Sequence, residues 1–168
     1  LEITKDELTK LKNYFTEADN LLKKESLLTE RAVWQLLLDK NGIFASPPPW
    51  GKITSFDLET LDINWQIPFG IKSIKDEEVK GDINFGGVMS TRGNVFFATG
   101  TADKYVRAFN SKNGNQLWSY KMKQAGSSPP MTFNYKNKQY LIINASGGKF
   151  YGYENQNSDM IYAFVNSN

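Results

Sequence analysis

The sequence predicts an all-β fold, a fragment of a β-propeller preceded by a short α-helical segment. Three observations support it: an internal repeat, regularly spaced short strands, and a 14% content of aromatic residues in a chain of 168. Residues 55–65 align without a gap on residues 108–118, and each copy runs from Phe through a polar turn to Trp. Units of about 40–50 residues with strands in each are typical of propeller blades. Trp65 and Trp118 are therefore expected to dock one blade against the next.

Residues 1–42 form a helical segment that differs from the rest of the chain. Thr4 followed by Glu7 is a capping-box pattern, which predicts the start of a helix. Apolar residues then recur at helical spacing over residues 8–22, and a second helix is expected from about Thr29 to the end of the segment. Acidic and basic side chains alternate on the polar face, which favours packing against a propeller flank over binding to a membrane surface.

Residues 43–168 are predicted to form propeller blades from nine strands, each bounded by Gly, Pro, Asn or Asp. The expected strands lie near residues 52–56, 63–67, 88–91, 95–99, 105–109, 116–121, 131–135, 139–144 and 161–165. If the Trp-bearing strand is the outermost, the chain supplies the outer half of one blade, one whole blade, and three strands of a last blade. Because a ring needs about 4–8 four-stranded blades, the chain is expected to be part of a larger protein that supplies the missing rim strand.

Each copy of the repeat contains a turn between its Phe and its Trp. Asp57 and Asn110 begin the two turns, where a short side chain can accept a hydrogen bond from its own backbone. Gly114 supplies a positive φ in the second copy, but Leu61 takes that place in the first. The first turn is therefore expected either to close differently or to carry strain.

The composition removes several classes of site. With no Cys and no His, the chain has no disulfide, no Cys/His zinc site and no Ser-His-Asp triad. A net charge of +2, with Lys and Arg scattered among acids, argues against nucleic acid as a partner. No apolar run approaches the roughly 20 residues that cross a bilayer, and because residue 1 is Leu, any signal peptide or anchor is expected upstream. Asp103 and Arg107 fall at a turn and on a strand, and they are expected to have a salt-bridge or hairpin role rather than a catalytic one.

Several further motifs occur in a fixed order along the chain. They are Pro48-Pro49-Trp50-Gly51 before a blade, Asn84-Phe85-Gly86-Gly87, residues 95–103 running into 106–109, and residues 130–133 with 138–143. Together with the tryptophan repeat, they resemble the C-terminal part of a pyrroloquinoline quinone (PQQ)-dependent dehydrogenase, most closely the membrane-bound glucose dehydrogenase group. The resemblance covers about residues 42–165, and it offers no counterpart for residues 1–40.

This resemblance implies an eight-bladed propeller in the bacterial periplasm, of which the chain would supply about two and a quarter blades. It implies PQQ and Ca²⁺ in the central channel, a sugar, polyol or alcohol as substrate, and quinone or a cytochrome as electron acceptor. The catalytic Asp and the calcium ligands of the family lie in earlier blades. We therefore assign no catalytic and no metal-binding residue, and we expect the chain to be inactive without its remaining blades. Membrane association through an upstream segment stays open.

The predicted cofactor-binding residues are Asn84, Phe85, Gly86 and Gly87. The resemblance matches this motif to a cofactor-contacting position, and the motif precedes an expected innermost strand that should face the channel mouth. Glycines let a planar ring approach the backbone, Phe85 offers an aromatic face, and Asn84 can donate to and accept from quinone and carboxylate oxygens. The alternative interpretation is an ordinary Gly-rich turn into a strand.

Two other functions are compatible with the sequence. A non-catalytic propeller scaffold of the bacterial envelope would carry the same tryptophan repeat. An Asp in an upstream channel-facing loop, with Glu and Asn calcium ligands, would distinguish the enzyme from this scaffold. Alternatively, several copies of the chain could form a ring by self-association, which a measurement of mass in solution would reveal.

Overall fold

The computed structural model describes residues 6, 9–10, 12–13, 16–17, 36–40, 43–148 and 157–165. The chain separates into two compact units, Leu1–Leu38 and Asp39–Asn168. The predicted boundary between residues 42 and 43 stays a prediction. Among the described residues, no helix has the length and apolar character needed to cross a membrane.

The first predicted helix is represented by the described residues between 6 and 17, which are helical. Asp6 and Lys10 lie one turn apart on it and form an exposed ion pair of 2.8 Å. The prediction of a second helix is wrong over residues 36–40, which are not helical. There the Asp39 N–H donates to the Ile43 carbonyl at 2.7 Å, and the Asp39 carboxylate accepts from the Ile43 N–H at 2.9 Å. Such local side-chain bonds compete with helix formation. The rest of that predicted helix lies outside the described residues.

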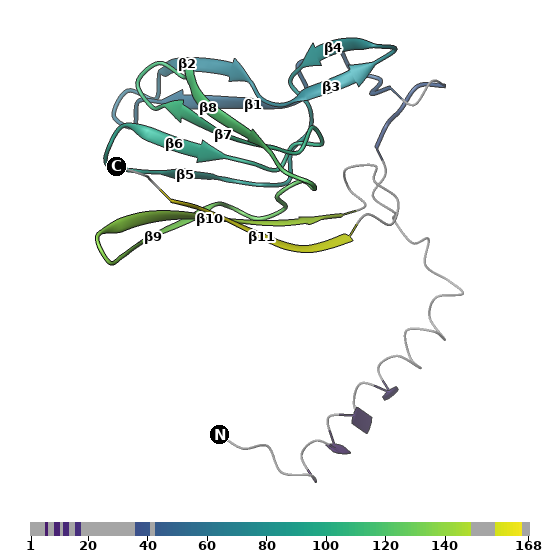
Figure 1. Cartoon of the computed structure of the whole chain (residues 1–168). Coiled ribbons are helices and arrows are strands. Elements are labelled where there is room, and N and C mark those ends of the chain that lie inside the picture. Colours follow the sequence, from purple (N-terminus) through teal and green to yellow (C-terminus); the bar gives the residue numbers. More distant parts are fainter. Residues whose placement is uncertain are drawn as a thin grey trace. The chain divides into compact units, whose positions relative to one another are not determined.

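Eleven strands lie in the part of the chain that the structure describes (Figure 1). They are β1 (Lys52–Phe56), β2 (Ile63–Pro68), β3 (Ile71–Ile74), β4 (Glu77–Lys80), β5 (Val88–Ser90), β6 (Val95–Ala98), β7 (Tyr105–Asn110), β8 (Gln116–Lys121), β9 (Met131–Tyr135), β10 (Lys138–Gly147) and β11 (Asn157–Val165). All nine predicted strands are present. The β3–β4 hairpin is absent from the prediction because its turn residues, Lys75 and Asp76, both have positive φ (49° and 68°). Such turns usually carry Asn-Gly or Asp-Gly.

The strands form antiparallel sheets in the order expected of successive blades. The sheets are β1-β2, β3-β4, β5-β6-β7-β8 and β11-β10-β9. Figure 1 shows the β1-β2 pair on one side of the four-stranded sheet and the β9, β10 and β11 strands on its other side. Because β8 carries Trp118 at one edge of the four-stranded sheet, β5 at the opposite edge is the inner strand. The described strands are therefore a propeller fragment, as the sequence predicted.

The two copies of the repeat share one strand register. Ser55 on β1 opposes Trp65 on β2, and Ala108 on β7 opposes Trp118 on β8. In both ladders the register then shifts at the Phe that follows the small residue. The predicted equivalence of the two tryptophans on outer strands is confirmed.

The turns of the two copies also close in the same way. The Leu61 N–H donates to the Asp57 carbonyl at 2.9 Å, and the Gly114 N–H donates to the Asn110 carbonyl at 2.8 Å. Leu61 and Gly114 have φ of 63° and 73°. Of the two alternatives for the first turn, the strained one is therefore correct. A left-handed conformation costs a residue with a Cβ about 1–2 kcal/mol.

Two apolar clusters hold the sheets together. The cluster between β1-β2 and the four-stranded sheet has buried Phe69, Phe96, Ala98 and Phe109, with Ile53, Trp65 and Ile67 packed against it. The cluster between the four-stranded sheet and β9–β11 has buried Val106, Met122, Leu141, Ile143 and Ala145, with Met89, Phe97, Tyr162 and Phe164 packed against it. Over β6 and β7, each face of the four-stranded sheet is thus covered by a neighbouring sheet, whereas β8 is exposed along its length.

Replacing Leu61 by Gly should stabilise the protein. Leu61 is 74% exposed, so little apolar burial is lost. Removing its Cβ relieves the left-handed strain, while the more flexible unfolded chain costs about 0.4–1 kcal/mol. We expect the free energy of unfolding to rise by about 0.5–1 kcal/mol in urea denaturation. Gly114→Ala is the matched control and should destabilise, because its Cβ would lie 2.9 Å from Trp65 Cε3 at a φ of +73°. Unchanged or lower stability of Leu61→Gly would contradict the strain.

Candidate functional site

The predicted segment from Asn84 to Gly87 lies directly before β5, at the inner edge of the four-stranded sheet. Asn84 forms an isolated antiparallel bridge with Thr101, and the Phe85 N–H donates to the Gly100 carbonyl at 3.0 Å. These bonds fix the segment against the connection between β6 and β7. The Asn84 side chain is exposed and Phe85 is 36% exposed. The Asn84 side chain and part of the Phe85 ring are therefore accessible to solvent at this edge.

The two glycines of the segment are explained by packing within the chain. A Cβ on Gly86 would lie 2.1 Å from the Thr99 carbonyl oxygen, and a Cβ on Gly87 would lie 2.8 Å from Pro129 Cγ. A Cβ on Gly100, on the facing backbone, would lie 2.0 Å from the Gly86 nitrogen. Gly86 and Gly87 thus allow two backbone segments to approach, and the groups that can face a planar cofactor are Asn84 and Phe85. Contact of the segment with a cofactor stays a prediction.

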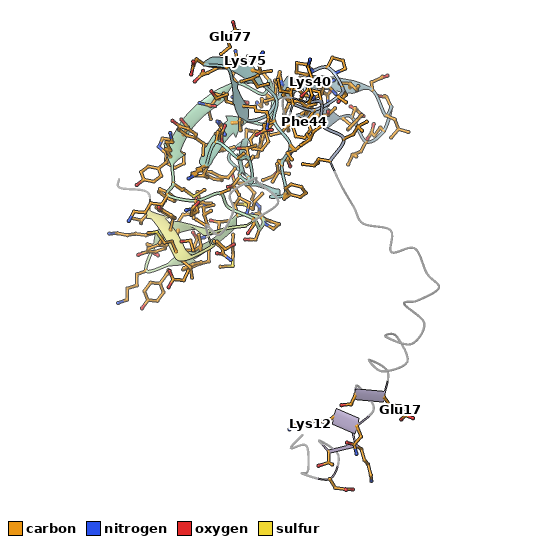
Figure 2. The ribbon with its side chains drawn as sticks, turned by 90° about the vertical axis from the view of Figure 1, so that its right-hand side faces the viewer. Lys12, Glu17, Lys40, Phe44, Lys75 and Glu77 are labelled. Carbon is orange, nitrogen blue, oxygen red and sulfur yellow. The ribbon has the colours of Figure 1, made fainter. Side chains whose placement is uncertain are left out.

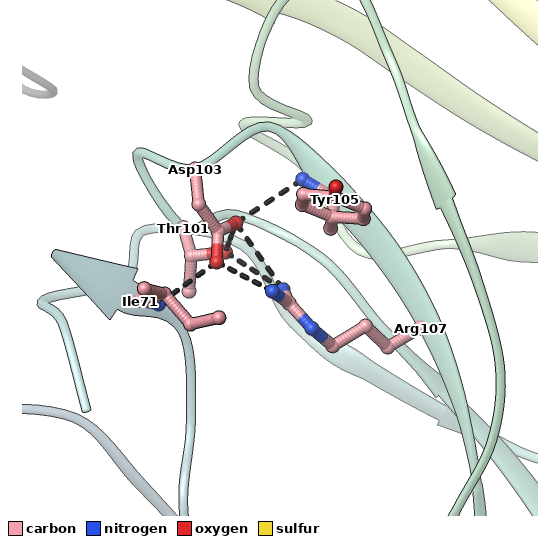
Figure 3. Close-up of polar contacts among 5 residues, drawn as sticks. All are labelled: Ile71, Thr101, Asp103, Tyr105 and Arg107. Atoms are coloured by element: carbon pink, nitrogen blue, oxygen red, sulfur yellow. Dashed lines mark hydrogen bonds and ion pairs between the residues drawn. The ribbon is translucent and has the colours of Figure 1, made fainter. Parts of the chain in front are cut away.

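Asp103 and Arg107 form the predicted salt bridge, which is confirmed, and their side chains are only 9% and 7% exposed. Figure 3 shows the pair at the centre of a polar network. Asp103 Oδ1 accepts from the Thr101 hydroxyl at 2.6 Å and from the Tyr105 N–H at 3.2 Å. Asp103 Oδ2 accepts from the Ile71 N–H at 2.8 Å. Because Ile71 begins β3 and Arg107 lies on β7, the network ties the hairpin to the four-stranded sheet.

A cleft of about 630 Å³ lies between the β3–β4 hairpin and strands β7 and β8. Its acidic and basic lining residues are Lys72, Glu78, Asp82, Asp103, Arg107 and Lys121. The sequence analysis identified only the Asp103–Arg107 pair among these six. The others were not found because the hairpin was not predicted and because isolated charged residues on strands carry no motif. Among the described residues, no group of three or more acidic side chains could hold a metal ion.

Asp82 is a buried carboxyl group at the base of this cleft, with a relative exposure of 1%. Its Oδ1 accepts from the Ile83 N–H at 2.9 Å and lies 4.0 Å from Lys72 Nζ. Its Oδ2 has no hydrogen-bond partner. Burial raises the pKa of Asp82 above 3.8, and the nearby Asp103 raises this pKa further, while Lys72 and the Ile83 N–H partly offset the rise. Desolvation outweighs the attraction to Lys72 because the carboxyl group is buried and Lys72 Nζ lies as far as 4.0 Å from Oδ1.

The blade order and the docked tryptophan define a β-propeller of the tryptophan-repeat class. The family profile "PQQ: Glucose/ethanol/alcohol dehydrogenase, beta-propeller domain" matches residues 4–141, a range that includes most of the helical segment. The chain therefore belongs to the family of PQQ-dependent sugar and alcohol dehydrogenases. The resemblance inferred from the sequence motifs is confirmed, but the expectation that residues 1–40 have no counterpart in the family is wrong from residue 4 onward.

Curated relatives agree with this family. The chain is 35% identical over 120 residues to the quinoprotein glucose dehydrogenase of Escherichia coli (strain K12). The aligned region covers 66% of this chain and 15% of that protein. It is 34% identical over 118 residues to the quinate/shikimate dehydrogenase (quinone) of Acinetobacter baylyi, covering 64% and 15%. The chain thus spans about 15% of the length of these relatives. The quinohemoprotein alcohol dehydrogenase of Comamonas testosteroni shares the fold, with a TM-score of 0.55 at 23% identity over 75% of this chain and 18% of that chain.

Asp82→Asn should change how stability depends on pH. Because the folded-state pKa of Asp82 is raised above 3.8, its favourable contribution is complete below the unfolded-state pKa and is lost as pH rises through the folded-state pKa. The amide of the Asp82→Asn variant does not titrate, so the variant does not lose stability in this way as the pH rises. The difference in free energy of unfolding, variant minus wild type, should therefore grow between about pH 4 and pH 7. Urea denaturation at several pH values measures it, with the exposed Asp76→Asn as the control. A constant difference across this range would contradict the raised pKa.

Proposed function

We propose that this chain is the C-terminal part of a PQQ-dependent dehydrogenase that oxidises a sugar, a polyol or an alcohol. The observation that carries the proposal is the family match over residues 4–141. Relatives named for glucose, for quinate or shikimate, and for glycerol support the substrate class. When bound, PQQ would accept the electrons of the oxidised hydroxyl group and supply the redox chemistry.

The role that we propose for this chain is to form part of the PQQ pocket with Asn84 and Phe85. Both residues lie at the inner edge of the complete blade. The Asn84 side chain is exposed, and Phe85 is 36% exposed. The Asn84 amide can donate to and accept from the oxygens of a quinone or a carboxylate. The Phe85 ring can lie against a planar ring system. This pair fits a flat, acidic cofactor without any contribution from Gly86 or Gly87.

The partners that we propose are the remaining blades of the parent protein. On β9, alternate residues Met131, Phe133 and Tyr135 are 55%, 44% and 56% exposed, and they lie on one face of the last sheet. Sheets covered on one face only usually carry polar residues on the other, so this apolar face supports a further blade that covers it. The missing blades would also supply the catalytic Asp and the ligands of Ca²⁺. We further propose a periplasmic location and quinone or a cytochrome as the electron acceptor.

Asn84→Ala in the complete parent protein should weaken PQQ binding while leaving the fold nearly intact. An uncharged hydrogen bond contributes about 0.5–1.5 kcal/mol, and about 1.4 kcal/mol corresponds to a tenfold change in affinity. We therefore expect a severalfold to roughly tenfold rise in the PQQ dissociation constant. Titration of the apoprotein with PQQ, followed by fluorescence, measures binding independently of turnover.

The matched control for this experiment is Asn64→Ala, which removes an exposed amide on the rim strand β2. It should leave the PQQ dissociation constant unchanged. If Asn84→Ala also leaves it unchanged, the segment is a plain turn into β5 and its cofactor role is lost. The 168-residue chain by itself is not the right material for activity assays, since we expect it to lack the catalytic groups.

A further inference from the structure

The polar cleft between the β3–β4 hairpin and β8 contains ionisable groups that the structural network does not use. Arg107 and Asp103 neutralise each other in the salt bridge and form one wall. Lys72 Nζ lies 4.0 Å from Asp82 Oδ1 and Lys121 Nζ lies 5.7 Å from the centroid of the Tyr105 ring, and each ammonium group has further N–H groups that can donate to a ligand. Glu78 and the unpartnered Oδ2 of Asp82 provide acceptors. The Glu78 side chain makes no hydrogen bond or ion pair with any other residue that the structure describes, whereas its backbone belongs to the β3–β4 ladder. These groups provide both hydrogen-bond donors and acceptors around one space.

The same side chains disfavour several classes of ligand. An anion such as phosphate would face the carboxylates of Glu78 and Asp82, and a metal ion would face the ammonium groups of Lys72 and Lys121. A flat aromatic ligand has no free ring to stack on, because the Tyr105 ring already has Arg107 Cζ at 4.8 Å and Lys121 Nζ at 5.7 Å from its centroid. An apolar ligand would leave the charged groups desolvated and unpaired.

A neutral molecule with several hydroxyl groups can pair with the carboxylate and the ammonium groups of this lining at the same time. We propose that this cleft binds a small polyhydroxy compound, such as a monosaccharide, at a site separate from the Asn84 segment. Hydroxyl groups of the ligand donate to the Glu78 carboxylate and accept from the ammonium groups of Lys72 and Lys121. The hydroxyls of Ser73 and Ser119, on opposite walls of the cleft, add two further donors or acceptors. The volume of about 630 Å³ is ample for such a molecule, since ligand pockets are commonly about 300–1,000 Å³.

The proposed site is connected to the predicted cofactor segment through one residue. Thr101 pairs with Asn84 by its backbone, and its hydroxyl donates to Asp103 in the wall of the cleft. Thr101 therefore links a ligand bound against this wall of the cleft to the Asn84 segment, which we propose contacts PQQ. The cleft itself is bounded by residues of this chain, so its binding can be measured without the remaining blades.

The test is titration of the ¹⁵N-labelled 168-residue chain with glucose, in the absence of PQQ, followed by NMR. Amide signals of Ser73, Glu78 and Ser119 should shift, while those of Phe85 should not. Glu78→Gln removes a charged acceptor, and losing such a bond should raise the glucose dissociation constant at least about tenfold. Glu77→Gln is the matched control, because Figure 2 shows Glu77 at the tip of the hairpin, directed away from the sheets. It should bind glucose like the wild type.

Three results would overturn the proposal. They are no shift at any cleft residue, an equal dissociation constant for Glu78→Gln and the wild type, or shifts confined to the Asn84 segment. Gluconate provides a further comparison: binding of this anion without binding of glucose would make the cleft an anion site and would also overturn it. None of these readouts involves PQQ or turnover, so a failure here leaves the proposed dehydrogenase function to its own test.

Discussion

The fold of the described blades depends on one aromatic contact between neighbouring sheets. Trp65 on β2 lies nearly parallel to Phe96, with ring centroids 5.8 Å apart at 12°, and Phe96 lies on Phe109 at 5.0 Å and 14°. The indole Nε1–H donates to the Ser111 carbonyl at 3.0 Å, in the turn of the next blade. The absence of a Cβ on Gly114 leaves room for the indole. One side chain thus supplies apolar packing, ring stacking and a hydrogen bond between two blades.

That contact positions the start of the connection that contains the β3–β4 hairpin and the Asn84 segment. With β1-β2 held against the four-stranded sheet, the chain leaving β2 enters the β3–β4 hairpin, which the Asp103 carboxylate secures through the Ile71 N–H. The polar cleft lies between this hairpin and strands β7 and β8. The chain then returns to the inner edge, where Asn84 pairs with Thr101. The Trp65 contact, the hairpin that borders the cleft and the Asn84 segment therefore follow one another along the connection between two blades.

The strands and the family could be predicted from the sequence because they rest on local patterns. Alternating apolar residues bounded by turn residues located nine strands, and the spacing of Trp65 and Trp118 revealed the repeat. The β3–β4 hairpin gave no such signal, since Lys75 and Asp76 take a turn conformation that their side chains do not favour. The environment of Asp82 could not be predicted either, because its burial follows from tertiary packing. For Gly86, the sequence predicted the approach of a planar ring, and the close contact with the Thr99 carbonyl oxygen became evident only in the fold.

Native-state hydrogen exchange on Trp65→Phe tests the central role of the Trp65 contact most directly. Phenylalanine keeps an aromatic ring but cannot donate to the Ser111 carbonyl, and the loss of one such bond costs about 0.5–1.5 kcal/mol. If Trp65 attaches one blade to the next, the amides of β1 and β2 should lose protection by a factor of about 2–13, while those of β10 should keep theirs. Unchanged protection of β1 and β2 would contradict this account.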